Sequence, residues 1–340
     1  MGSVKDLQIL VSPSPEQPGR GVFIFSDRYS VFDWGEMPDH IAHKGQALCL
    51  IGAYFFEKAE ALGIPTHYRG LVKEGRTYKL TELTEPVNAM EVALFSVIHP
   101  RVAEGRYDYS DYGPHLRNFL LPLEVIFRNA LPPGSSVFKR LQQGTLTLDE
   151  LGLASPPQPG QELHPPLLDV STKLERSDRY LSWAEAQQIA GLTDQEVAEL
   201  RSASLRLNEV ITAEAGRLNL VHEDGKAEFA LDGRRQLVVV DVIGTPDECR
   251  FTMDGVPVSK EVARVFYRAT PWFAELDAAK KADPIGWKST LRTTPPPLPP
   301  HLAQLISSLY QAFCNEVTGR NWFSCPTLRE TVAEIRQMLG

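Results

Sequence analysis

Three charged residues, Lys226, Glu228 and Asp241, stand where a folded hairpin would gather them. The strand-like run that holds Lys226 and Glu228 ends at Asp232-Gly233, which is a turn signal, and the β-branched run 237–240 follows. This order predicts a β-hairpin. Because facing residues of a hairpin lie close together and alternate residues share a face, Glu228 should lie near Asp241, with Lys226 beside it.

Carboxylates on rigid strands are the ligands that a magnesium ion bridging phosphates requires. The turn Thr245-Pro246-Asp247 comes shortly after Asp241, and Arg250 follows it. The stretch therefore predicts a site for a metal and an anionic ligand. The alternative is a solvated hairpin with ordinary surface charges.

Three upstream clusters could add to such a site. In the first, Asp27 is followed by Lys44, which stands at the predicted start of a helix. A lysine beside free backbone N–H groups favours an anionic ligand. The alternative is a strand exit held by a local pair between Asp27 and Arg28.

The second cluster holds Arg128, then Gly134-Ser135-Ser136 and Lys139-Arg140. Arginine, small hydroxyls and flexible backbone form a phosphate cradle, although the spacing is not that of a Walker A loop. The third cluster holds Thr172-Lys173 and Ser177-Asp178, whose polar groups could also simply cap the next segment.

The elements that must position these residues follow from periodicity and breakers. We expect strands over 4–11, 21–26 and 122–128, with several short ones over 66–99. We expect helices near 44–62, 193–218, 259–268, 301–318 and 327–339. Thr193 and Glu196 form a capping box at the second of these helices. Residues 152–166, rich in Pro and Gly, should be an irregular connection, and residues 295–300 a linker.

The composition bounds the function. The chain has 340 residues and a net charge of −8, which argues against nucleic acid as the main partner. No apolar run is long enough for a membrane span, and no signal peptide is evident. The four scattered cysteines indicate reduced thiols in a cytoplasmic protein.

The clusters, in this order, resemble the phosphoribosylaminoimidazole-succinocarboxamide synthase (SAICAR synthetase) family of purine biosynthesis, over residues 2–252. The family's Pro-Leu-Glu-x-x-x-Arg strand is matched by Pro122 to Arg128. Its Asp-x-Lys-x-Glu-Phe strand is matched by Asp224 to Phe229. Its Thr-Pro-Asp-x-x-Arg segment is matched by Thr245 to Arg250. Ser26 to Asp33 is similar to its Thr-Asp-Arg-x-Ser-x-Phe-Asp segment.

The resemblance implies an α+β fold of two lobes, with a strand-rich N-terminal lobe (1–115), an ATP-grasp-like second lobe (116–340) and an ATP cleft between them. It implies an ATP-dependent carbon–nitrogen ligase that uses Mg²⁺. Carboxyaminoimidazole ribotide would be phosphorylated to an acyl phosphate, and the amino group of L-aspartate would displace phosphate to give SAICAR. The partners would be these small molecules, with no nucleic acid and no membrane; a homo-oligomer is left open.

The resemblance also implies roles for single residues. Lys226, Glu228 and Asp241 would be catalytic, and the two carboxylates would bind the metal. Lys5, Glu228 and Asp241 would bind ATP. The substrates would be bound by Asp27, Lys44, Arg128, Ser135, Asp178 and Arg250.

Three positions depart from the family pattern. Gly2-Ser3 stands where a glycine and a further lysine open the family's first strand. Val242 replaces an acid after the metal-binding aspartate, and Ser177 replaces a histidine. These changes leave open a related ligase with another amine or carboxylate, and a catalytically silent relative that binds nucleotides.

Overall fold

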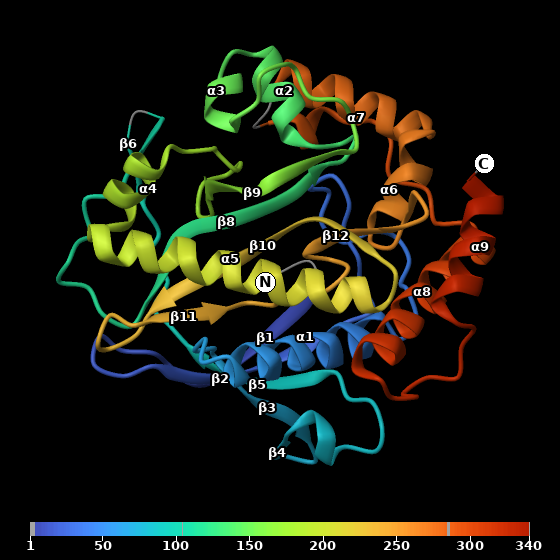
Figure 1. Ribbon diagram of the computed structural model, residues 1–340, viewed down its shortest axis with the longest axis horizontal. Coiled ribbons are helices and arrows are strands. Elements are labelled where there is room, and N and C mark those ends of the chain that lie inside the picture. The colour runs from blue at the N-terminus through green and yellow to red at the C-terminus, as the bar shows by residue number, and fades with distance from the viewer. Residues whose placement is uncertain (1–3, 104, 284–285, 340) are drawn as a thin grey trace.

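The computed structural model describes residues 4–103, 105–283 and 286–339. The sequence departure at Gly2-Ser3 lies outside the described residues. Two antiparallel sheets form the framework, and helices cover them (Figure 1). The expected α+β class is confirmed.

The first sheet is built from the N-terminal part of the chain and has the strand order β1-β2-β5-β3-β4. Its strands are β1 (Lys5–Val11), β2 (Gly19–Phe25), β3 (Tyr68–Lys73), β4 (Arg76–Tyr78) and β5 (Ala89–Leu94). β1 is an edge strand, and its outward residues include the exposed Leu7 and Ile9. The strands predicted in this part of the chain are confirmed.

The second sheet has the order β13-β12-β10-β8-β9, and β11 pairs with the far end of β10. Its strands are β8 (Phe119–Leu131), β9 (Gln161–Thr172), β10 (Val221–Leu231), β11 (Leu237–Val240), β12 (Cys249–Met253) and β13 (Val256–Pro257). The predicted hairpin is therefore formed by β10 and β11. A separate small hairpin, β6 (Arg101–Ala103) with β7 (Arg106–Asp108), connects the two sheets along the chain.

The prediction of an irregular connection over 152–166 is wrong at its end, because β9 begins at Gln161. Prolines argue against a strand since they cannot donate to the ladder. β9, however, is an edge strand, and its pairing with β8 is interrupted where Pro165 and Pro166 stand. An edge strand tolerates proline at such an interruption.

Two long helices pack against the sheets and against each other. α1 (Lys44–Ala61) packs on the first sheet, and α5 (Asp194–Arg217) packs on β10, β8 and β9 and also meets α1 (Figure 1). The Thr193 hydroxyl accepts from the Glu196 N–H, as the capping box predicts. At the C-terminus, α8 (Pro300–Thr318) covers another side of α1, and α9 (Leu328–Leu339) packs on α8.

The shorter helices lie mostly around the second sheet. They are η1 (Leu80–Glu82), α2 (Ser136–Gln142), α3 (Leu148–Leu151), α4 (Trp183–Ala190), α6 (Glu261–Arg268), α7 (Pro271–Ala282) and η2 (Trp287–Thr290). α6 was predicted and α7 was not. The signals for α7 were present: Thr270 caps its first turn, and Pro271 occupies its first position.

The two sheets are joined beside the hairpin. The backbone N–H of His67 donates to the Val239 carbonyl at 2.9 Å, and the Val239 N–H donates to the Pro65 carbonyl at 2.9 Å. Thr66 therefore forms a parallel bridge with Val239. This connection fixes the end of β11, and with it Asp241, against the first sheet.

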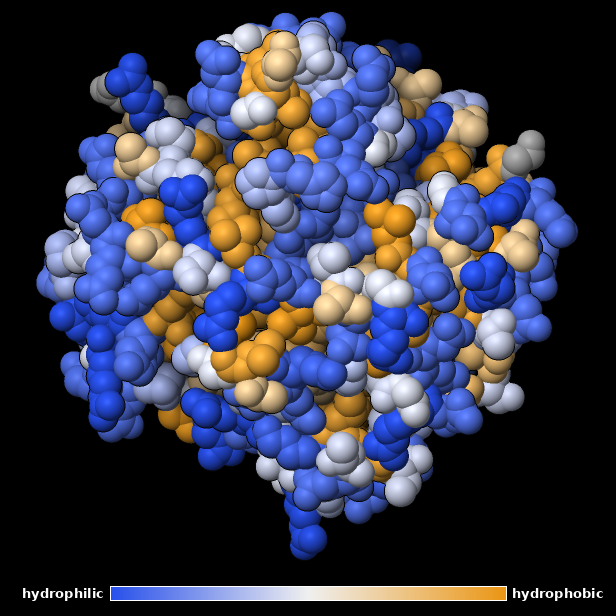
Figure 2. All heavy atoms as spheres, in the orientation of Figure 1, coloured by the Kyte–Doolittle hydropathy of each residue, from blue (hydrophilic) through white to orange (hydrophobic). Residues whose placement is uncertain are grey.

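The surface is that of a polar protein. Hydrophilic residues cover most of the face seen in Figure 2, and the apolar residues lie between them in separate patches. Within the described ranges, no helix has both the length and the apolar character needed to cross a bilayer. Cys49, Cys249 and Cys314 are buried free thiols.

Candidate active site

The hairpin brings the predicted acids together. Glu228 pairs in register with Val240 of β11, so Asp241 follows directly beside it. On its other side Glu228 faces Glu124 of β8. Lys226, two residues earlier on the same face, places its Nζ 3.0 Å from Glu124 and 3.9 Å from Glu228.

Two lysines neutralise the acids. Lys5 of β1 forms an ion pair with Asp241, and Lys173, just after β9, places its Nζ 2.5 Å from Glu228. Burial and the nearby Asp241 raise the pKa of Glu228 to about 8. Burial also opposes ionisation of Asp241, but attraction to Lys5 and Lys173 outweighs it and lowers the pKa of that carboxyl. This part of the molecule has acids that repel each other and therefore attract cations.

An apolar cavity of about 340 Å³ opens on one side of these acids. Its walls come from both sheets and include Leu7, Ile9, Phe23, Leu94, Leu120 and Val240. Lys173, Glu228 and Asp241 line it as well and supply its charged end. Leu7 and Ile9 are about half exposed, at 46% and 57%, so this wall presents apolar surface to a ligand.

A polar cavity of about 360 Å³ opens on the other side. Lys226 and Glu124 line it near the acids, and Arg128 and Arg250 line it farther along the strands. Arg128 is buried between Asp169, at 3.1 Å, and Asp224, at 3.5 Å. The Arg250 Nε donates to Asp224 at 2.8 Å. These carboxylates hold both guanidinium groups rigidly at the cavity wall.

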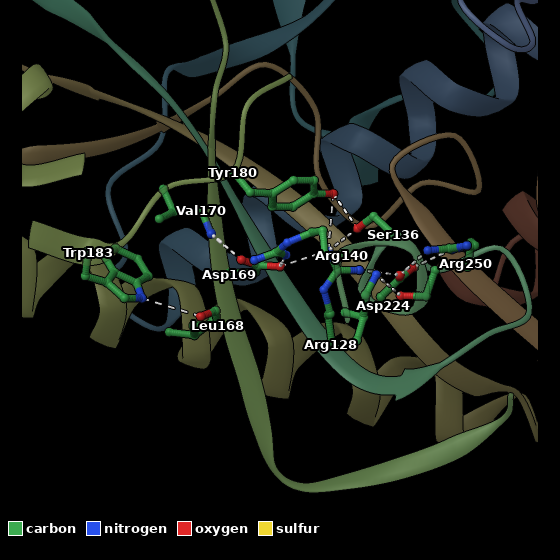
Figure 3. Close-up of polar contacts among 12 residues, drawn as sticks. Arg128, Ser136, Arg140, Leu168, Asp169, Val170, Tyr180, Trp183, Asp224 and Arg250 are labelled. Carbon is green, nitrogen blue, oxygen red and sulfur yellow. Dashed lines mark hydrogen bonds and ion pairs between the residues drawn. The ribbon is translucent and has the colours of Figure 1, made fainter. Parts of the chain in front are cut away.

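Figure 3 shows how this wall is organised. Arg128 also donates to the Ser136 hydroxyl at 3.2 Å, and Ser136 donates to the Tyr180 hydroxyl at 2.7 Å. Arg140 pairs with Asp169 and stacks on the Tyr180 ring, with its guanidinium 4.0 Å from the ring centre. Arg140 is thus a support behind Arg128, since it does not line the polar cavity.

The C-terminal segment adds two cations that the sequence did not indicate, Lys260 and Arg264. The Lys260 Nζ has no hydrogen bond or ion pair to any residue in the described part of the chain. Burial lowers its pKa. The other cationic side chains of this cavity are paired with acids, so Lys260 is the group most available to an anion.

Several predicted residues have local partners that account for them. Lys44 is fully buried, and its Nζ lies 2.7 Å from Asp247, which also accepts from Tyr310 at 2.5 Å. The Asp27 carboxylate accepts from the backbone N–H of Gly45 at 3.0 Å and so caps α1. The Ser135 hydroxyl caps α2, and the neighbouring Ser136 lines the cavity instead.

The remaining predicted residue, Asp178, lines the polar cavity. Burial, and then the charge of Glu124, raise its pKa. Val242, where an acid was expected, is buried and packs toward Gly52 of α1, so its side chain lies in the core and not at the site. Glu124 supplies an additional carboxylate beside Glu228 from a different strand.

Sequence reasoning assigned no role to Glu124, Asp224, Tyr180, Lys260 or Arg264. It included Ser136 and Lys173 only as members of the second and third clusters. Asp224 and Glu124 lie inside the two quoted strand motifs, so their positions were available signals. Within the described residues no group of three His, Cys, Asp or Glu forms a ready metal site. A metal would therefore need ligand oxygens in addition to Glu228 and Asp241.

A further cavity of about 640 Å³ lies between α5 and the end of β11. Its lining includes Glu199, Arg206 and Arg234 but none of the acids described above. Glu228 lines the apolar cavity, and Lys226, whose Nζ is 3.9 Å from Glu228, lines the polar cavity. These two cavities are therefore the stronger candidate for chemistry.

Comparison with known proteins agrees with this arrangement. A sequence profile described as SAICAR synthetase matches residues 13–269. A provisionally named phosphoribosylaminoimidazole-succinocarboxamide synthase of Archaeoglobus fulgidus is 49% identical over 339 residues and covers 100% of both chains.

Two solved structures share the fold. The SAICAR-synthase from Saccharomyces cerevisiae complexed with SAICAR has a TM-score of 0.63 at 20% identity and covers 95% of each chain. A SAICAR synthetase in complex with ADP has a TM-score of 0.56 at 22% identity, covering 84% of this chain and 97% of that one. At these identities the likeness establishes the fold alone.

Proposed function

Because this chain belongs to the SAICAR synthetase family, we propose that it is an ATP-dependent amide ligase of de novo purine biosynthesis. It joins L-aspartate to carboxyaminoimidazole ribotide and releases SAICAR, ADP and phosphate. The observation that carries the proposal is that one row of acids and lysines lines both cavities: Lys173 and Glu228 line the apolar cavity, and the neighbouring Lys226 and Glu124 line the polar cavity.

The apolar cavity is suited to the adenine of ATP. A flat aromatic base would cover the exposed Leu7 and Ile9 and contact Phe23. The phosphates would then extend toward Lys5 and Lys173 at the charged end. The solved relative that is described with ADP supports a nucleotide in this fold.

Glu228 and Asp241 fit a magnesium ion. Mg²⁺ is usually held by one or two carboxylates together with substrate phosphates, and two mutually repelling buried acids favour a cation. When bound, Mg²⁺ neutralises charge on the triphosphate during phosphoryl transfer. Lys5, paired with Asp241, and Lys173, paired with Glu228, supply positive charge beside these acids.

The polar cavity is suited to the ribotide. Its phosphate would bind at Lys260, Arg264 and Arg250, and its carboxylate would face Lys226. Arg128 would contact the ribotide from the wall, held by Asp169 and Asp224. Asp178 would hold the amine of L-aspartate. Lys44, Asp27 and Ser135 would act on the substrates through the elements they fix, not by contact.

Two steps follow from this placement. A carboxylate oxygen of the ribotide attacks the γ-phosphorus, and ADP leaves from it. The neutral amino nitrogen of L-aspartate then attacks the acyl carbon, and the bond from that carbon to the phosphate oxygen breaks as phosphate leaves. The nitrogen gives up one proton and keeps the other as the amide forms. The Lys226 Nζ lies 3.9 Å from Glu228, beside the proposed metal site. From there Lys226 stabilises the negative charge on the transferring phosphoryl group.

We also propose that the division at residues 115 and 116 separates a nucleotide-binding lobe from a lobe with metal and substrate residues, and that the protein works in the cytoplasm.

The test is ADP release from ATP in the presence of carboxyaminoimidazole ribotide and a panel of amines. Turnover with L-aspartate alone supports the proposal. Turnover only with another amine would assign the chain to a related ligase. Nucleotide binding without ADP release under any condition would indicate a silent relative.

A further inference from the structure

Asp241 adopts a backbone conformation that is uncommon for residues other than glycine. Its φ is +64°, in the left-handed region, and it directly follows the last residue of β11. Contacts from the surrounding structure help to keep a non-glycine residue in this region. Because the carboxylate of Asp241 must face Glu228, this backbone turn determines the geometry of the acid pair.

One side chain from the first sheet contacts that turn. The His67 Nε2 lies 3.1 Å from the backbone carbonyl oxygen of Asp241. A carbonyl oxygen can only accept a hydrogen bond, so the Nε2–H of the ring is the donor. His67 is 3% exposed and its ring packs edge-on to Phe23 and Phe56.

The backbone of His67 is equally constrained. Its N–H donates to Val239 and its carbonyl accepts from Ala93 at 2.7 Å. Side chain and backbone of one residue thus hold both ends of the segment from Val239 to Asp241 against the first sheet. His67 therefore links the first sheet directly to the backbone of Asp241.

We propose that His67 is a positioning residue for the magnesium–nucleotide site: its ring donates to the Asp241 carbonyl and holds the Asp241 carboxylate opposite Glu228. This inference rests on the proposed function. Partners of this kind orient metal ligands, and their loss weakens metal binding about tenfold or more.

The test measures ADP binding by calorimetry while magnesium is titrated. His67→Phe keeps an aromatic ring between Phe23 and Phe56 but removes the donor, and His67→Met removes it with a flexible apolar chain. His67→Gln restores an N–H donor. The matched control is His222→Phe, since His222 is also buried between two aromatic rings, Phe127 and Phe251.

The half-saturating magnesium concentration should rise about tenfold in His67→Phe and His67→Met. It should recover at least partly in His67→Gln and stay unchanged in His222→Phe, while ADP binding without magnesium stays the same in all of them. An unchanged magnesium requirement in the donor-free variant that folds would overturn the inference. If the wild type itself binds ADP without any magnesium dependence, the proposed function has failed instead.

Discussion

Replacing Asp241 by asparagine removes one charge from the acid pair and keeps the size of the side chain. The Asp241 side chain is only 23% exposed and is paired with Lys5, so the substitution disrupts a largely buried ion pair. We expect the loss of the pair to cost about 1–2 kcal/mol of folding stability. Relief of the repulsion that raises the pKa of Glu228 offsets part of this cost.

These terms set the thermal effect. An unfolding entropy of about 2.1 cal/mol/K per residue gives roughly 0.7 kcal/mol/K for this chain. The expected fall in Tm is therefore only about 1.5–3 °C. The rate should change far more. Loss of one magnesium ligand removes about 3–4 kcal/mol of transition-state stabilisation, which is roughly 10²–10³-fold in kcat.

The assay is ADP release at saturating substrates, with Tm measured on the same samples. Asp254→Asn is the control, because Asp254 is also an aspartate with a left-handed φ but lies exposed in the turn between β12 and β13. It should keep its activity. An Asp241→Asn protein that is folded and turns over within about threefold of wild type would refute the metal assignment.

Three further changes test other parts of the account. Lys260→Met should raise the KM for the ribotide about tenfold or more, since it removes a charge-assisted contact to phosphate. The control Lys139→Met changes an exposed lysine outside the polar cavity and should leave the KM unchanged. Equal KM values for the two variants would remove Lys260 from the site. Arg128→Met should lower the free energy of unfolding, measured in urea, by about 3 kcal/mol, because the buried carboxylates of Asp169 and Asp224 each lose a partner. A loss below about 0.5 kcal/mol would contradict this. Burial lowers the pKa of His222 to about 4, so the stability it contributes is present above its unfolded pKa of about 6.5 and is lost as the pH falls from there through 4. Urea unfolding should show the wild type losing up to about 3 kcal/mol more than His222→Phe between pH 7 and pH 4; parallel pH profiles would contradict it.

The centre of the site was predictable because its determinants are local. The turn at Asp232-Gly233 and the alternation of strand residues place Glu228 beside Asp241 without any knowledge of distant contacts. Val242 lies beyond β11, after the left-handed residue Asp241, and its side chain is buried in the core. Where two elements meet through a short turn, spacing alone determines the neighbours.

The remaining site depends on contacts between distant parts of the chain. Lys44 has the features of an anion-binding lysine, yet its partner is Asp247, 203 residues away. Lys260 lines the polar cavity from the N-cap position of α6, and no local pattern around Lys260 encodes its place at that cavity. Ser135 and Ser136 differ by one place, and only the start of α2 decides which hydroxyl caps and which faces the cavity.

The central claim is that ATP activates a substrate carboxylate for attack by an amine. It is tested most directly by running the reaction with ribotide labelled with ¹⁸O in its carboxylate and following the label by mass spectrometry. The account predicts that, in the presence of L-aspartate, each phosphate released carries one oxygen from that carboxylate. Phosphate released without the label would contradict it.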